Sequence, residues 1–147
     1  MSDIMTCVLV GNLTRDPELK HTAGGVAVAE FGIACNKARR LPNGEWENTP
    51  HFFDVAVWEG QADNVVASLH RGDRVMIQGE LRYSQWEDKE TGKKRNKVTV
   101  NATNIGPALR WARVPKIDRA EKGGGAVAAE RPVGGTVDWD DAETEPF

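Results

Sequence analysis

The sequence has few of the residues that build metal sites, disulfide frameworks or catalytic centres. It contains two cysteines and three histidines in 147 residues, with no CxxC motif and no histidine at metal-ligand spacing. We interpret Cys7 and Cys35 as small buried residues in a reducing cytoplasm rather than as a disulfide. His21, His51 and His70 are scattered over a turn, a strand and a helix end. The sequence therefore predicts no enzymatic activity, no cofactor and no metal.

Long apolar runs are also missing. No run reaches the ~18 residues that a membrane span needs. The N-terminus, Met1-Ser2-Asp3, lacks the basic and then apolar pattern of a signal peptide. We therefore expect a cytoplasmic protein without a membrane partner.

A positive charge excess is absent from the whole chain, but the charge is unevenly distributed. Residues 1–119 hold 17 basic and 15 acidic residues, a net charge of +2, whereas residues 120–147 hold 2 and 7, a net charge of −5. The acidity is thus in the tail. A body near neutrality makes the placement of its basic residues more informative than their sum.

The segment His51–Trp58 is rich in β-branched and aromatic residues and predicts a strand. Alternation places Phe53, Val55 and Val57 on an apolar face, and Phe52 and Trp58 on the other face. Two rings about 20 Å apart, at ~3.3 Å per residue, have the spacing to stack bases of a single strand. The alternative is that either ring packs under a loop or in a subunit contact.

The other elements follow from periodicity. Apolar residues at helical spacing, from Ala62 to Leu69, predict a helix within 59–72, with Gly72 just past its end. Asn43-Gly44 and Thr91-Gly92 mark turns. Alternation of period two predicts strands at 4–12, 18–21, 26–36, 49–58, 74–86 and about 98–105.

This order of elements is that of an all-β, five-stranded OB-fold barrel with one short helix between the third and fourth long strands. Basic residues interleaved with tryptophan on two hairpin arms suit a single strand, because rings stack bases and cations follow phosphates. For Trp46 the alternative is a ring folded onto its own solvated hairpin. The predicted nucleic-acid-binding residues are Phe52, Trp58, Trp86, Trp46, Arg39, Arg40, Arg82, Lys93, Lys94, Arg95 and Lys97.

From about residue 116 the composition changes. We expect an OB domain at 1–115, a flexible linker at 116–137 rich in Gly and Ala, and an acidic partner-binding tip at 138–147. A terminal ring after proline, at the end of a disordered acidic tail, is typical of a captured C-terminal peptide. The predicted partner-binding residues are Asp140, Asp141, Glu143, Glu145, Pro146 and Phe147.

Together, these motifs resemble the bacterial single-stranded DNA-binding protein family. The matching pieces are Val8-Leu9-Val10-Gly11-Asn12-Leu13, Asp16-Pro17-Glu18, Gly24-Gly25, Phe52 to Trp58, Ala62 to Leu69 with Arg71-Gly72, Gly79 with Leu81-Arg82, and the acidic tail ending in Pro146-Phe147.

The resemblance implies a homotetramer of OB domains that wraps and protects single-stranded DNA in replication, recombination and repair. It implies a nucleoid-associated protein whose tail recruits repair and replication enzymes. It also implies that Phe52, Trp58 and Trp86 stack on bases, with Arg82 a basic residue near them.

The sequence departs from the family pattern at three places. Asp54 stands where the family can carry a cation, and its charge is expected to repel phosphate and so to lower the affinity or shift the path of the strand. In the tail, Asp140-Asp141 sit further back than usual and Glu145 takes an apolar position. Trp111 lies past the core motifs, where it is interpreted as extending a subunit contact.

Two other functions remain open on the residues alone. One is an OB-fold interaction module of a replication complex that binds DNA weakly, which the near-neutral body and Asp54 favour. The other is an RNA-binding OB protein, because stacking rings do not read a 2′-hydroxyl.

Overall fold

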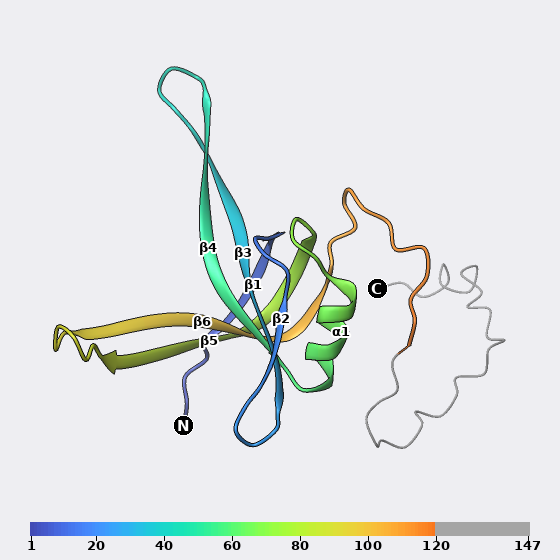
Figure 1. Cartoon of the computed structure of the whole chain (residues 1–147). Coiled ribbons are helices and arrows are strands. Elements are labelled where there is room, and N and C mark those ends of the chain that lie inside the picture. Colours follow the sequence, from blue (N-terminus) through green and yellow to red (C-terminus); the bar gives the residue numbers. More distant parts are fainter. Residues whose placement is uncertain (120–147) are drawn as a thin grey trace. The chain divides into compact units, whose positions relative to one another are not determined.

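Five long strands close into a barrel, and a short strand extends its edge. The computed structural model describes residues 1–119. The strands of this part are β1 (Thr6–Leu13), β2 (Glu18–His21), β3 (Ala27–Arg40), β4 (Trp46–Trp58), β5 (Arg74–Glu87) and β6 (Lys94–Pro107), and the helix is α1 (Gly60–Ser68). The sheet order is β1-β5-β6-β4-β3-β2, and pairing of β1 with β3 closes the ring (Figure 1). The predicted barrel, with one helix between its third and fourth long strands, is confirmed.

The inward positions of the long strands form the core. Phe31, Ile33, Val55, Val57 and Ile77 are fully buried. They occupy alternate positions on their strands, as a period of two requires of one sheet face. The apolar alternation that the sequence shows in β3, β4 and β5 therefore points to the barrel interior.

The helix contributes to this core but is shorter than predicted. Ala62 and Val65 are buried on α1, which ends at Ser68. Leu69 leaves the helix with φ −113° and ψ 143°, yet its side chain still joins the core. The prediction that Gly72 follows the helix end is wrong. Gly72 instead lies in the next turn, with φ 91°, and donates its backbone N–H to the carbonyl of Leu13.

Strand ends also differ from the prediction. β1 begins at Thr6 rather than Ile4, whose side chain is fully exposed beyond the barrel. β3 continues four residues past the predicted end, to Arg40, and β4 begins at Trp46 instead of 49. Backbone pairing from Cys35 outward continues these strands without burial, so hydrophobic periodicity did not reveal them.

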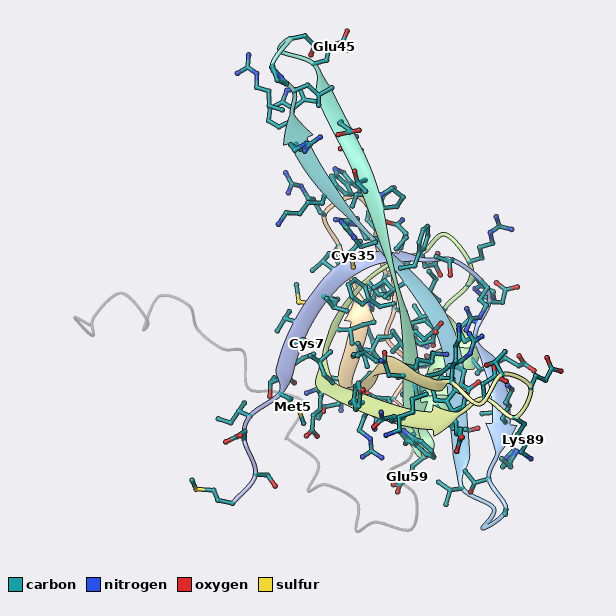
Figure 2. The ribbon with its side chains drawn as sticks, turned by 90° about the vertical axis from the view of Figure 1, so that its left-hand side faces the viewer. Met5, Cys7, Cys35, Glu45, Glu59 and Lys89 are labelled. Carbon is teal, nitrogen blue, oxygen red and sulfur yellow. The ribbon has the colours of Figure 1, made fainter. Side chains whose placement is uncertain are left out.

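The outer parts of β3 and β4 form one two-stranded arm, and those of β5 and β6 form a second. The two arms leave the barrel in different directions (Figure 1). The β3–β4 arm, residues 35–51, turns at Asn43-Gly44 with φ 86° at Gly44, as predicted. The β5–β6 arm, residues 82–98, turns at Thr91-Gly92. Figure 2 shows Glu45 at the tip of the first arm and Lys89 at the tip of the second.

The two cysteines are free, as predicted, but half-buried rather than buried. Both line the inner side of their strands near the barrel wall, where Cys7 and Cys35 pack against the core. Burial raises the pKa of the Cys35 thiol. No helix in the described part of the chain has the length and apolar character to cross a membrane.

Candidate nucleic-acid interface

The outward face of β4 carries three exposed aromatic rings. Trp46, Phe52 and Trp58 are 68%, 69% and 40% exposed. They are six residues apart, so alternation places all three on one face in steps of roughly 20 Å. Trp46 joins this face because β4 begins earlier than the predicted strand. Large exposed rings on one face of a sheet mark a binding surface.

The β5–β6 arm brings a fourth ring to the same face. On β6, Thr99 lies opposite Asp54 of β4 and also opposite Arg82 of β5. Cross-strand partners share a face, so Arg82 lies outward beside the β4 rings. Trp86, four residues further along β5, is 46% exposed on that face. We call this surface, with its four rings, the ring face.

Strand alternation separates the predicted cations. Arg40 lies opposite Trp46 and therefore shares the ring face. Arg39 lies opposite Glu47 on the other face, where its Nη2 donates to the Glu47 carboxylate at 2.9 Å. On β6, Arg95 lies opposite Trp86 and is on the ring face. Lys94, the next residue, is therefore on the far face. The structure thus brings Arg40 to the rings, and places Arg39 and Lys94 behind them.

Two cations on the ring face are held by carboxylates. The Arg95 Nε donates to Asp88 at 2.8 Å. The Lys97 Nζ lies 2.8 Å from an oxygen of Asp54. Four predicted cations have no ion pair to any residue of 1–119: Arg40, Arg82, Lys93 and Lys94.

Asp54 is the centre of a three-residue charge link. Besides Lys97, the Arg15 guanidinium lies 3.7 Å from its carboxylate. The Lys97 hydrogen bond, with both positive charges, holds the Asp54 pKa below its ordinary value despite partial burial. The carboxylate on the ring face is therefore compensated by two cations, one from the β1–β2 loop and one from β6.

A glycine makes room for this link. Gly32 lies opposite Asp54 on β3. A β-carbon at Gly32 would collide with the Thr14 hydroxyl and press on the Arg15 guanidinium. The bare backbone therefore lets the β1–β2 loop lie across β3, where Thr14 also donates its N–H to the Gly32 carbonyl at 2.9 Å.

The position of Trp58 is set by its neighbours on both sides. Its indole Nε1 donates to the Asn101 side-chain oxygen of β6 at 3.3 Å. The next residue, Glu59, adopts φ 62° and ψ −140°, and this sharp turn joins β4 to α1. The Glu59 N–H donates to the Ala27 carbonyl at 2.8 Å. The turn and the hydrogen bond hold the indole at the end of the ring face.

Two further predictions concern the C-terminal tail and metal binding. The predicted partner-binding tip, 138–147, and most of the predicted linker lie outside the described residues. Within residues 1–119, no group of three or more His, Cys, Asp or Glu side chains is arranged to hold a metal ion.

Comparison with known proteins decides the family. The model of the single-strand binding protein family matches residues 4–108. The chain belongs to this family.

Relatives support the assignment over most of the chain. The single-stranded DNA-binding protein of Borreliella burgdorferi is 41% identical over 105 residues, which cover 71% of this chain and 70% of that protein. The protein of the same name from Mycobacterium bovis is 39% identical over 135 residues, covering 90% of this chain and 81% of its own.

Solved structures of the family have the same fold. A deletion mutant of the single-stranded DNA binding protein from Thermus aquaticus superposes with a TM-score of 0.62 at 30% identity, covering 74% of this chain and 52% of that one. The small single-stranded DNA-binding protein from Streptomyces coelicolor gives a TM-score of 0.61 at 26% identity, covering 74% and 97%. The chain thus spans about half the length of the Thermus protein.

Sequence reasoning missed two residues that fix side chains of the ring face, Arg15 and Asn101, and one exposed ring on the far face, Tyr83. Arg15 lies in a loop distant in sequence from Asp54, and no local pattern joins them. Asn101 carries no signal beyond its place in an alternating strand. Tyr83, 59% exposed on the far face of the β5–β6 arm, continues the alternation of the buried face of β5. It is exposed because the arm has left the barrel.

Proposed function

We propose that this protein binds and protects single-stranded DNA without sequence preference. The observation that carries the proposal is the ring face, where four exposed rings from two hairpins share one side of the sheet with unpaired cations. The relatives named above as single-stranded DNA-binding proteins support the same ligand. We place this activity in the cytoplasm, at the nucleoid, in replication, recombination and repair.

Stacking explains why the binding is independent of sequence. A base stacked on a ring contributes about 1–3 kcal/mol whatever the base, because every base has a π face. Cations such as Arg40 and Arg82 contact phosphates, which are the same at every nucleotide. The proposed contacts therefore read no base edge.

Quenching of tryptophan fluorescence during titration with oligo(dT), repeated at several salt concentrations, tests the proposal. We expect quenching that saturates, and a log K that falls linearly with log salt. The variant carrying Phe52→Ala, Trp58→Ala and Trp86→Ala is the control and should lose most of the affinity while keeping its fold by circular dichroism. Absence of quenching in the intact protein would contradict the proposal.

The same titration separates the alternatives. An interaction module has one observation in its favour, because Arg95 and Lys97 are already neutralised by carboxylates on the ring face. Such a module would bind oligo(dT) only at very low salt. An RNA-binding protein would bind oligo(U) more tightly than oligo(dT) of equal length, since only the RNA offers a 2′-hydroxyl.

We further propose that the protein acts as a homotetramer. Over Thr6–Gly11, β1 pairs with β5 on one side, and its pairing with β3 is confined to Asn12 and Leu13. An unpaired strand edge is a template for another chain. Val8, Val10 and Met76 are also exposed on the adjoining outer surface.

Light scattering after size-exclusion chromatography measures the assembly. The intact protein should have four times the mass of one chain, and Val8→Glu together with Met76→Glu should reduce that mass. Thr22→Glu, in the exposed β2–β3 turn, is the matched control and should leave the mass unchanged. A monomeric intact protein would exclude the assembly.

The acidic tip is proposed to recruit replication, recombination and repair enzymes. The sequence supports this through the net charge of −5 on residues 120–147 and the terminal Pro146-Phe147. Deleting residues 138–147 should abolish capture of such enzymes and tighten DNA binding modestly at low salt, because the acidic tip competes with DNA for the cations. Phe147→Ala should abolish capture alone. Unchanged capture and unchanged affinity in the deletion variant would contradict this role.

A further inference from the structure

Trp111 is an exposed ring outside the segment that defines the family. It lies in the irregular stretch after β6, past residue 108, where the family match ends. Its side chain is 72% exposed. The guanidinium carbons of Arg74 and Arg110 lie 4.9 Å and 5.1 Å from the ring centroid. Both guanidinium groups thus lie over the ring as cation–π partners. An aromatic ring with two arginines on it combines the two elements of a single-strand binding site, a stacking surface and phosphate partners.

The site is held in place by the barrel. The N–H of Ala108 donates to the Arg74 carbonyl at 2.9 Å, which ties the stretch to the start of β5. Arg74 donates through Nη1 to the Asn12 side-chain oxygen at 3.0 Å. The Asn12 Nδ2 in turn donates to the Gly72 carbonyl at 2.9 Å. The guanidinium against Trp111 is therefore oriented before any ligand arrives, which lowers the entropy lost on binding.

The strand register places this site in line with the ring face. Arg74 lies opposite Asn12, Asn12 opposite Ala34, and Ala34 opposite Phe52. Partners across neighbouring strands share a face, so the row runs over four strands on the outside of the barrel. Three strand spacings of about 4.8 Å give roughly 14 Å between the β-carbons at its ends. Ala34, with only a methyl group, is the side chain beside Phe52 in this row.

The charges around Trp111 favour a polyanion. No carboxylate within residues 1–119 forms an ion pair with Arg74, Arg110 or Arg113. This contrasts with Arg95 and Lys97 on the ring face, which are already paired.

We propose that Trp111, with Arg74 and Arg110, is an additional stacking site for single-stranded DNA. The strand stacked on Phe52 continues around the barrel past Ala34 and Asn12 and places a base on the Trp111 ring. The base takes the place of the Arg110 guanidinium over the ring, and both guanidinium groups pair with the flanking phosphates. This inference rests on the proposed function and extends its path beyond the ring face. A second copy of the chain is the other occupant that an exposed tryptophan could have, and the experiment separates the two.

The experiment is a length series of oligo(dT), measured by fluorescence anisotropy of a labelled oligonucleotide with the full chain. The lengths run from below to above the ~4–16 nucleotides that one OB domain covers. Trp111→Ala should weaken binding of the long oligonucleotides roughly five- to hundredfold. Binding of the shortest should not change, because they contact only Phe52 and its neighbours. Trp111→Phe should restore most of the affinity. Leu109→Ala, exposed two residues away, is the matched control and should bind like the intact protein.

A second measurement observes the ring directly. A variant in which Trp46, Trp58, Trp86 and Trp139 are replaced by Phe keeps Trp111 as its one indole. Quenching of its emission by long oligo(dT), and not by the shortest, is the expected result. Unquenched emission with bound long DNA overturns the site.

The outcomes also separate this site from the function. If the intact protein binds no oligo(dT), the proposed function fails. If it binds, and Trp111→Ala binds equally well at every length, the site alone fails. If Trp111→Ala lowers the mass found by light scattering and weakens short and long oligonucleotides alike, Trp111 belongs to a contact with a second copy, and the site is again overturned.

Discussion

The two arms have the same architecture and different chemistry. Each is a two-stranded hairpin that leaves the barrel and carries a tryptophan on the ring face. The β3–β4 arm holds three basic and two acidic residues in 35–51, whereas the β5–β6 arm holds six and three in 82–98. The strand β4 continues from Trp46 in the first arm to Phe52 and Trp58 beyond it, so rings predominate on β4. The difference indicates that stacking is concentrated on β4 and electrostatic attraction on the β5–β6 arm.

A salt titration distinguishes these two contributions. Stacking changes little with ionic strength, while phosphate contacts give a slope of about 0.7 in log K for each phosphate neutralised on a single strand. Ring variants on β4 should therefore change the affinity, and cation variants on the β5–β6 arm should change the salt slope. The ion pair of Asp54 with Lys97 joins β4 to this arm.

Removing one ring from β4 and one from the β5–β6 arm gives the largest expected effect. Phe52→Ala and Trp86→Ala should each cost about 1–3 kcal/mol of binding free energy and leave the salt slope unchanged, because no charge is removed. The double variant should lose close to the sum, since Phe52 is on β4 and Trp86 is on the β5–β6 arm. Oligo(dT) titration at two salt concentrations measures both quantities. A changed slope in Phe52→Ala would show that stacking and electrostatic attraction are not divided between β4 and the β5–β6 arm.

Releasing the cations held by Asp54 comes next in size. Asp54→Asn frees Arg15 and Lys97 for phosphates, so the salt slope should steepen by up to about 1.4, and affinity at low salt should rise. Glu47→Gln is the matched control, because it releases Arg39 on the far face and should leave the slope unchanged. If Asp54→Asn instead weakens binding at every salt concentration, the carboxylate acts by orienting its two cations.

Adjacent arginines on the β3–β4 arm give a smaller and sharper contrast. Arg40→Ala should reduce the salt slope by about 0.7, the share of one phosphate. Arg39→Ala should leave it unchanged, because Arg39 faces away and is paired with Glu47. The measurement is the slope of log K against log salt for both variants. Equal losses would mean that the arm is wrapped by DNA on both faces.

The smallest expected effect is the acid dependence of the Asp54 link. The pKa of Asp54 is lowered in the folded protein, chiefly by the Lys97 hydrogen bond. Its contribution to stability is therefore complete above the ordinary Asp pKa of ~3.9 and is lost as pH falls through the lower, folded value. NMR titration of the carboxyl should show a midpoint below the ordinary value.

In the same titration, Lys97→Met should move the midpoint upward. Lys89→Met, at the arm tip, should not move it. A midpoint that stays low in Lys97→Met would assign the shift to Arg15 instead.

The barrel was predictable from the sequence because burial and alternation coincide in its walls. Phe31, Val55 and Ile77 are inward by period two, and Phe52 and Trp58 are outward by the same rule. The arms lie beyond this signal. Their backbones pair without burying side chains, so the strand that ends at Arg40 was predicted too short. For the same reason the sequence did not predict that Arg39 and Arg40 lie on opposite faces.

The ion pairs were harder still to predict from the sequence. Arg15, Asp54 and Lys97 meet because a loop, β4 and β6 converge over Gly32. Asp54 was expected to oppose phosphate, because the sequence shows its charge and not its partners. The helix was placed too long because Leu69 fits the helical spacing, although it reaches the core from extended backbone.

The turn at Glu59 has a consequence for thermal stability. Its backbone lies in a region that glycine alone enters easily, and a non-glycine residue there costs about 1–3 kcal/mol. Glu59→Gly should therefore raise the melting temperature by a few degrees, after the entropy that glycine adds to the unfolded chain is counted. Glu59→Ala, which keeps the strain and removes the carboxylate, should not. The relaxed turn would hold the neighbouring Trp58 less firmly, so the more heat-resistant variant should bind oligo(dT) more weakly.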